Sequence, residues 1–178
     1  MTFSLSSPAR TLDELVIAFF RASEGQWRSQ RRYYTLKNNQ TEEVTSYITV
    51  RYLTPDSQEL QTLARLHDLP EGMLLSCGTE VTWESHYDSP SRKPAQGSTL
   101  FGARDGLLYR DRGFATPKPI VARFDFRDEH TMRLFTEYDQ SSFEEELKLI
   151  GHQYRTRQTI ISRAGEEQMI GQYLEKRL

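Results

Sequence analysis

FEEELKLIGHQYRTRQTII, residues 143–161, reads as two β-strands joined by a short turn at IGH. Both runs are rich in residues that suit a pleated, half-buried strand, and the turn contains a glycine. In an antiparallel hairpin with this turn, Glu145 lies opposite Arg157 and Leu147 lies opposite Arg155. The hairpin is therefore predicted to bring one carboxylate close to two guanidinium groups.

Two interpretations of this charge cluster remain open. On the outside of the protein, Glu145 and Arg157 would form a cross-strand ion pair worth a fraction of a kcal/mol. On the inside, Arg155 and Arg157 could bind the carboxylates of a ligand through bidentate contacts, while Glu145 met its cationic or N–H groups.

Eight further strand-like runs accompany this hairpin, separated by turn signals such as Asp105-Gly106 and Ala164-Gly165. With the hairpin they give ten predicted strands: 27–36, 44–53, 73–84, 98–104, 107–111, 120–127, 131–138, 143–150, 154–163 and 168–176. Short strands joined by tight turns pair antiparallel, and closure into a barrel removes exposed edges. The predicted fold is mainly β, an antiparallel barrel of about ten strands, which is wide enough to hold one small ligand.

Two helices and one loop complete the prediction. Apolar residues recur at helical spacing over 11–24, where Thr11 and Glu14 form a capping-box pattern. A second, short helix is expected to start at Thr54-Pro55. The Pro- and Ser-rich segment 88–97 is expected to be a mobile loop at the rim.

The strand WRSQRRYYTL, residues 27–36, places arginines on both of its faces. Arg31 shares a face with Trp27 and Ser29, whereas Arg28 and Arg32 share the other. One face must point into the barrel, where an arginine without an anionic partner is costly. An inward arginine therefore indicates an anionic ligand or an internal acid.

Composition excludes several classes of function. The 178 residues suit a single domain, 1–178, and 23 basic against 25 acidic residues argue against a nucleic-acid partner. We expect a cytoplasmic location without membrane insertion, because the first 15 residues lack a signal-peptide pattern and no apolar run is long enough to span a bilayer. The lone Cys77 is predicted to be a buried small hydrophobe, and the four scattered histidines indicate no metal site. No dinucleotide, P-loop or serine-nucleophile motif is present.

Trp83 and Tyr87 frame the stretch TWESHY. Aromatic residues in such a position are more often core than ligand platform, but they could also line a pocket for a flat conjugated ligand.

Several stretches together resemble the S-type phycobilin:cysteine lyases, a family that attaches open-chain tetrapyrroles to cysteines of phycobiliproteins. They are FFRASEGQWRSQR (19–31), CGTEVTW (77–83), GST (97–99), GFATPKPIVARF (113–124), TEYD (136–139), EEELKL (144–149), RTR (155–157) and YLEKRL (173–178). The matches follow one another in order over nearly the whole chain. The resemblance implies a barrel similar to lipocalins and fatty-acid-binding proteins.

The resemblance also implies roles for individual residues. Glu145 would contact the pyrrole nitrogens, and Arg155, Arg157 and Arg31 would contact the propionates and carbonyls. We assign Glu145 and Arg155 as catalytic, and assign Arg31, Trp83, Tyr87, Arg157 and Glu175 to substrate binding. The sequence departs from the family pattern at Lys148, at His152 and at Tyr34-Thr35, which bears on which bilin and which acceptor are used.

The implied function is that of a phycobiliprotein lyase, which binds a phycobilin such as phycocyanobilin or phycoerythrobilin and promotes its thioether attachment to a cysteine of an apo-phycobiliprotein subunit. No cofactor is expected, because the partner supplies the thiol. A homodimer, or a heterodimer with a related lyase subunit, and a plastid stroma location in an alga are further options. The alternative is a non-catalytic carrier of bilin, fatty acid or another anionic hydrophobic ligand. A non-catalytic subunit that works only with a related lyase is the third interpretation.

Overall fold

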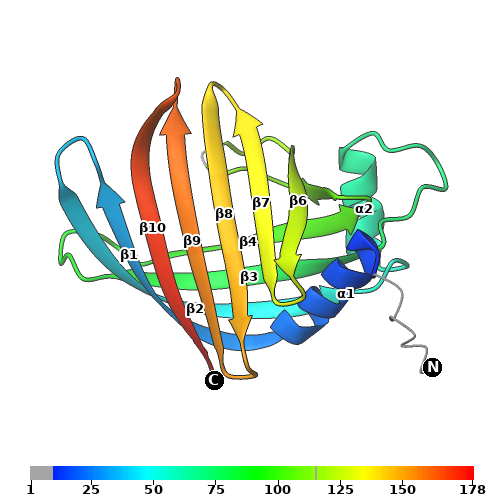
Figure 1. Cartoon of the computed structure of the whole chain (residues 1–178), viewed down its shortest axis with the longest axis horizontal. Coiled ribbons are helices and arrows are strands. Elements are labelled where there is room, and N and C mark those ends of the chain that lie inside the picture. Colours follow the sequence, from blue (N-terminus) through cyan, green and yellow to red (C-terminus); the bar gives the residue numbers. More distant parts are fainter. Residues whose placement is uncertain (1–9, 115) are drawn as a thin grey trace, which may run out of the picture.

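A computed structural model describes residues 10–114 and 116–178 of the chain. Its strands form a closed antiparallel barrel in the order β1-β10-β9-β8-β7-β6-β5-β4-β3-β2, in which pairing of β1 with β10 closes the ring (Figure 1). The strands are β1 Gly25–Thr35, β2 Gln40–Leu53, β3 Cys77–Tyr87, β4 Ala95–Arg104, β5 Leu107–Arg110, β6 Ile120–Asp128, β7 Thr131–Tyr138, β8 Ser141–Ile150, β9 Tyr154–Arg163 and β10 Glu166–Arg177. The predicted ten-stranded antiparallel barrel with two helices is confirmed.

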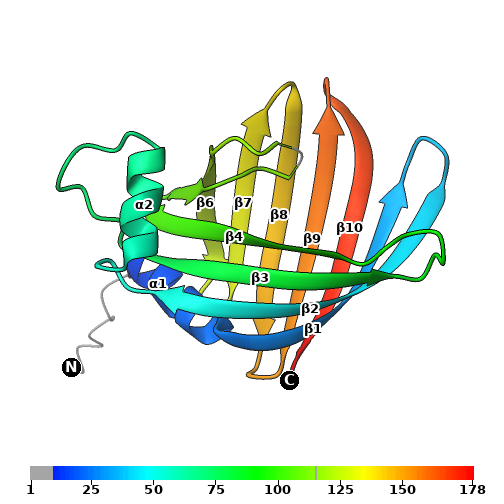
Figure 2. The same ribbon diagram turned by 180° about the vertical axis from the view of Figure 1, so that it is seen from behind.

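The strands on the two sides of the barrel run in different directions. Strands β6 to β10 cross the strands β2 to β4 behind them at a steep angle (Figure 1), and the view from behind shows β2, β3 and β4 side by side (Figure 2). No helix in the described part of the chain is long and apolar enough to cross a membrane. Of the first 15 residues, for which we expect no signal peptide, residues 1–9 lie outside the described part.

Helix α1, Leu12–Ser23, lies across one end of the barrel (Figure 1). The predicted capping box is present, because the Glu14 backbone N–H donates to Thr11 Oγ1 at 3.2 Å and the Thr11 N–H donates to Glu14 Oε2 at 2.8 Å. Phe19 and Phe20 are buried on the face that points into the barrel. The helix therefore closes this end with aromatic side chains.

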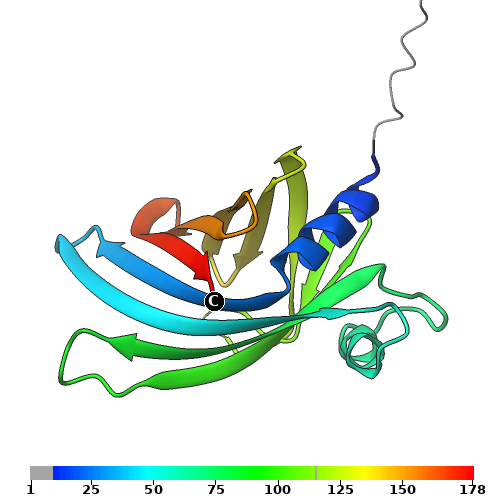
Figure 3. The same cartoon turned by 90° about the horizontal axis from the view of Figure 1, so that it is seen from below.

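Helix α2, Gln58–Leu66, packs on the outside of the barrel (Figure 3). Its Leu60 and Leu63 form a small separate core with Leu53 and Leu75. The prediction that this helix starts at Thr54-Pro55 was wrong, because Ser57 is the N-cap and accepts from the backbone N–H of Leu60. Thr54 instead donates to Asp56 Oδ1 at 2.5 Å in the preceding turn.

Two predicted boundaries around β3 and β4 were wrong. Strand β3 starts at Cys77 rather than at residue 73, because Leu75, two residues before it, packs under α2 instead of pairing. Strand β4 starts at Ala95, so it takes in the last three residues of the predicted loop. Gly97 pairs with Trp83, and a Cβ on Gly97 would lie 2.6 Å from the indole atom Cζ2 of Trp83. A glycine here lets the indole lie across the neighbouring strand.

The predicted register of the β8–β9 hairpin was wrong by two residues. Glu145 pairs with Thr159 and Leu147 with Arg157, because the connection has three residues and Gly151 takes a left-handed φ of 58°. A shift of two residues leaves each side chain on the same face of the sheet. The carboxylate and both guanidinium groups therefore still share one face, and it points inward.

Candidate functional site

The barrel holds an interior cavity of about 590 Å³, a size typical of small-molecule sites. Part of its lining is apolar and includes Phe19, Phe20, Ile48, Val50 and Leu108. The rest carries charged side chains, four of them more than nine-tenths buried. The charged members from the strands are Arg31, Arg110, Glu145, Arg155, Arg157 and Glu175.

Arg155 and Glu175 form one buried ion pair. They occupy directly paired positions on β9 and β10, and Arg155 Nε donates to Glu175 Oε2. Glu175 is 1% exposed and Arg155 is 7% exposed. The inward-facing interpretation of the charge cluster is therefore correct for Arg155, and Glu175, assigned from the resemblance alone, joins the same site.

Glu145 and Arg157 form the second ion pair, in which Arg157 Nη2 donates to Glu145 Oε1. The two residues sit diagonally across β8 and β9. The second carboxylate oxygen, Glu145 Oε2, is buried and has no hydrogen-bond partner among the described residues. Since a buried acceptor without a donor is costly, this oxygen is suited to receive an N–H from a ligand.

Burial and neighbouring charges shift the pKa values of these groups in opposite directions. Burial alone would raise the pKa of Glu175, but the charge and hydrogen bond of Arg155, with the charges of Arg157 and Arg31, together outweigh burial and lower this pKa below its usual value. Burial alone would lower the pKa of Arg157, but the charge and hydrogen bond of Glu145, with contributions from Tyr173 and Glu175, together outweigh burial and raise that pKa. Glu175 and Arg157 therefore carry their charges at neutral pH.

Arg31 points into the cavity from β1, as one of the three arginines of its strand was predicted to do. Its Nε donates to Ser29 Oγ at 3.2 Å, and its guanidinium lies 5.3 Å from the ring centroid of Tyr173. Arg28 and Arg32 lie on the exposed outer face, where Arg32 pairs with Glu43.

The structure separates the two aromatic residues predicted for the site. Trp83 lines the cavity from β3. Tyr87, four residues further along the same strand, is not among the residues that line the cavity and instead packs against Arg92, whose guanidinium lies 3.9 Å from the ring centroid. The structure therefore does not bring Tyr87 together with the other predicted site residues.

Sequence reasoning missed Arg110, which points into the cavity from β5. It is 5% exposed, and its Nη1 lies 3.9 Å from Glu145 Oε2. The pattern LLYR carried a weak signal, since Leu108 and Arg110 are two residues apart and must share a strand face.

An aromatic wall near Arg110 was missed as well. Phe114, in the connection after β5, stacks on Phe143 with a centroid separation of 4.9 Å, and Tyr138 stacks on Phe143 at the same separation. Phe114 lines the cavity, and the guanidinium of Arg110 lies 4.7 Å from its ring centroid. A flat conjugated ligand would find aromatic faces here as well as at Trp83.

Cys77 is fully buried in the hydrophobic core, as predicted. Burial, with a smaller contribution from Asp13, raises the pKa of its thiol to about 12. The thiol is therefore protonated at neutral pH and unsuited to act as a nucleophile. The part of the chain that the structure describes contains no group of three or more His, Cys, Asp or Glu side chains that could hold a metal ion.

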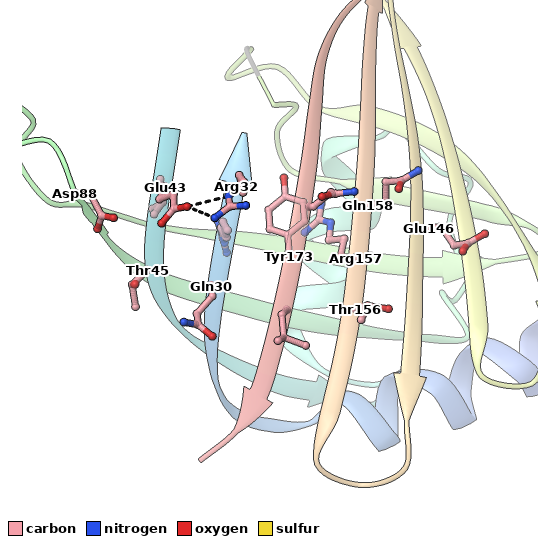
Figure 4. A pocket seen from close by; sticks show the side chains of 14 residues that line it. Gln30, Arg32, Glu43, Thr45, Asp88, Glu146, Thr156, Arg157, Gln158 and Tyr173 are labelled. Atoms are coloured by element: carbon pink, nitrogen blue, oxygen red, sulfur yellow. Dashed lines mark hydrogen bonds and ion pairs between the residues drawn. The ribbon is translucent and has the colours of Figure 1, made fainter. Parts of the chain in front are cut away.

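A second hollow, of about 610 Å³, lies mainly over outward-facing side chains of β1, β2 and β8 to β10 (Figure 4). Most of its lining residues are polar, and Arg32 and Glu43 form an exposed ion pair there. The interior cavity is the stronger candidate site, because only there are charged groups held away from water.

Known proteins resemble this chain over nearly its whole length. A family model described as CpeS-like protein matches residues 16–178. A protein from Nostoc sp., provisionally named phycocyanobilin lyase CpcS 2, is 57% identical over 98% of this chain and 98% of its own length. A protein from Picosynechococcus sp., provisionally named chromophore lyase CpcV, is 54% identical over 90% of this chain and 80% of its own length.

The fold has a counterpart among solved structures. The S-type phycobiliprotein lyase CPES from Guillardia theta superposes with a TM-score of 0.76 and covers 95% of this chain and 98% of its own. At 22% identity this match supports the barrel architecture alone. With the family model spanning all but the amino-terminal residues, the chain belongs to the CpeS-like protein family.

Proposed function

We propose that this chain is a phycobiliprotein lyase: it binds a phycobilin in the barrel cavity and promotes thioether attachment of that bilin to a cysteine of an apo-phycobiliprotein subunit. Membership of the CpeS-like family and relatives of 57% and 54% identity that carry lyase names support this proposal. The observation that carries it is the buried carboxylate of Glu145, with one oxygen free, in a cavity that carries excess positive charge.

The cavity has the charge expected for a dicarboxylate ligand. Four buried or half-buried guanidinium groups face two carboxylates, and a fifth, Arg112 at the rim, is matched by Asp111 at 3.6 Å. Two positive charges therefore remain uncompensated in the lining. A phycobilin carries two propionates, so it can supply the missing negative charges.

Glu145 is placed to act on the tetrapyrrole nitrogens. Its free oxygen can accept an N–H, and its charge, held in place by Arg157, stabilises the protonated tetrapyrrole. Protonation makes the ethylidene carbon of the end ring more electrophilic. The acceptor thiolate then attacks the ethylidene carbon and forms the new C–S bond. The C=C double bond of the ethylidene group becomes a single bond, its electron pair neutralises the positive charge of the tetrapyrrole, and the proton that the tetrapyrrole had gained stays on the bilin.

The lyase supplies positioning rather than a nucleophile. Cys77 is buried, and its raised pKa keeps it protonated, so the attacking thiol comes from the acceptor subunit. Trp83 and Phe114 give the conjugated ligand flat apolar contacts that fix its orientation. Use of phycocyanobilin or phycoerythrobilin without a further cofactor, a cytoplasmic or plastid-stroma location, and pairing with itself or with a related lyase subunit remain part of the proposal.

The test is to co-express the chain with a bilin-producing pathway and with candidate acceptor subunits. A covalent adduct on the acceptor, seen as zinc-dependent fluorescence on a denaturing gel, is the expected result. A carrier would instead bind phycocyanobilin or a fluorescent fatty acid in titrations without increasing adduct formation over acceptor alone. That outcome would show that the chain is a binding protein and not a lyase.

A further inference from the structure

The arginines of the cavity fall into two groups according to their partners. Arg155 donates to Glu175, and Arg157 donates to Glu145, so each of these cations already has a carboxylate. Arg110 and Arg31 make no hydrogen bond to a carboxylate among the described residues. The two uncompensated charges of the cavity therefore sit on these two side chains.

Arg110 is the more unusual of the two because it is buried. Its Nε has no hydrogen-bond partner among residues 10–114 and 116–178, and its closest carboxylate oxygen, Glu145 Oε2, is beyond hydrogen-bond distance at 3.9 Å. Burial lowers the pKa of Arg110, and Glu145 offsets this only in part. A buried guanidinium without its full set of acceptors is costly, and an anionic ligand would remove that cost.

Aromatic rings hold this guanidinium in place. Phe101 and Phe114 have ring centroids 4.9 Å and 4.7 Å from the central carbon of Arg110. Contacts of this kind fix the plane of the group and leave its N–H edges for an acceptor. The geometry is that of a preformed carboxylate anchor.

Arg31 is similarly placed on a different wall. Its guanidinium lies over the ring of Tyr173, and Ser29 Oγ is its hydrogen-bond acceptor. In the strand order, β1 and β5 are separated by four steps in one direction and six in the other, so the two arginines project from nearly opposite sides of the barrel. They cannot both serve as one bidentate site, but they can each take one of two separate carboxylates.

We propose that Arg110 and Arg31 are the two carboxylate anchors of the cavity, one for each propionate of the bilin. This assignment rests on the proposed function. Arg155 and Arg157 are then positioning residues, which act through Glu175 and Glu145 and do not bind the propionates themselves. Arg110 is the binding residue that we did not assign from the sequence pattern or from the resemblance.

The experiment compares phycocyanobilin with its dimethyl ester, which lacks both negative charges. Both compounds are titrated, by visible absorption, into the wild-type chain, Arg110→Met and Arg31→Met. A hydrogen bond between charged partners contributes enough that each substitution should weaken binding of the diacid by about tenfold to a hundredfold. Binding of the diester should change by less than about twofold. Equal weakening of diacid and diester, or no weakening of either, would overturn the assignment.

A matched control and a stability measurement separate binding from structure. Arg123 lies on the exposed face of β6 and stacks on Phe135 at 4.9 Å, so Arg123→Met removes a similar cation–aromatic contact outside the cavity and should leave both affinities unchanged.

The ligand-free Arg110→Met chain should have a Tm equal to or above that of wild type, because it loses a buried, under-paired charge. A lower Tm with unchanged selectivity between diacid and diester would show that Arg110 stabilises the fold and does not bind the ligand. If the wild-type chain binds neither compound, the proposed function fails instead.

Discussion

Arg155 and Glu175 face each other across the β9–β10 pair, and the guanidinium donates through Nε to Glu175 Oε2 inside the barrel. Both side chains are more than nine-tenths buried. In such a pair, mutual attraction offsets the loss of hydration, so that removal of one partner leaves the other charge buried and uncompensated. Several measurable properties of the chain depend on this pair.

Glu175→Gln should destabilise the protein strongly. It leaves Arg155 without its carboxylate, and the free energy of unfolding measured with urea should fall by about 3–5 kcal/mol. The double variant Arg155→Met, Glu175→Leu removes both charges and should recover most of that loss. A loss below about 1 kcal/mol in the single variant would mean that water already hydrates the pair.

The same pair predicts a pH dependence. Arg155, together with Arg157 and Arg31, outweighs the effect of burial and holds the pKa of Glu175 below the ordinary value of about 4.3, so the pair contributes fully above that pH. As the pH falls toward the lower pKa of the folded state, the contribution should decrease by about 1.4 kcal/mol for each pH unit. The stability difference between wild type and Glu175→Gln should therefore be constant from pH 7 to 5 and smaller at pH 3. A difference that is equal at pH 3 and pH 7 would contradict this pKa direction.

Cys77→Ala tests whether the chain's own thiol takes part in transfer. Because Cys77 is fully buried and its thiol stays protonated, the native protein should resist iodoacetamide and the variant should transfer bilin at the wild-type rate. The loss of a small core side chain should cost about 1 kcal/mol of stability. Loss of transfer in a variant that retains its Tm would show that a bilin–Cys77 intermediate forms.

Most of the barrel could be predicted from the sequence because the signals for its strands and turns each lie within a short stretch of residues. Alternation of buried and exposed residues marks each strand, and short turns between strands require antiparallel neighbours. The errors occur where tertiary contacts override the local pattern. Leu75 looks like part of a strand, yet it packs under α2 with Leu60. The start of β4 is set by pairing of Ala95 with Ser85, which a Pro- and Ser-rich composition does not indicate.

The site was less predictable because it depends on the exact register between paired strands. The prediction that Arg155 and Arg157 share one strand face with Glu145 was correct despite a wrong hairpin register, since an error of two residues preserves the face. Arg155 and Glu175 pair within the β9–β10 hairpin, but the register of that hairpin shifts between Glu167 and Met169, and the sequence pattern does not mark this irregularity. Arg110 lies on a strand of only four residues, too short for alternation to show that it points inward.

Glu145→Gln separates binding from chemistry. The amide has the same shape and keeps an oxygen for Arg157, but it has no charge with which to stabilise a protonated tetrapyrrole. Phycocyanobilin should still bind, whereas the rate of transfer to the acceptor subunit should fall by about a hundredfold. Glu144→Gln is the matched control, because Glu144 is adjacent on β8 and points to solvent, and it should transfer at the wild-type rate. Wild-type transfer by Glu145→Gln would show that protonation of the bilin does not depend on this carboxylate.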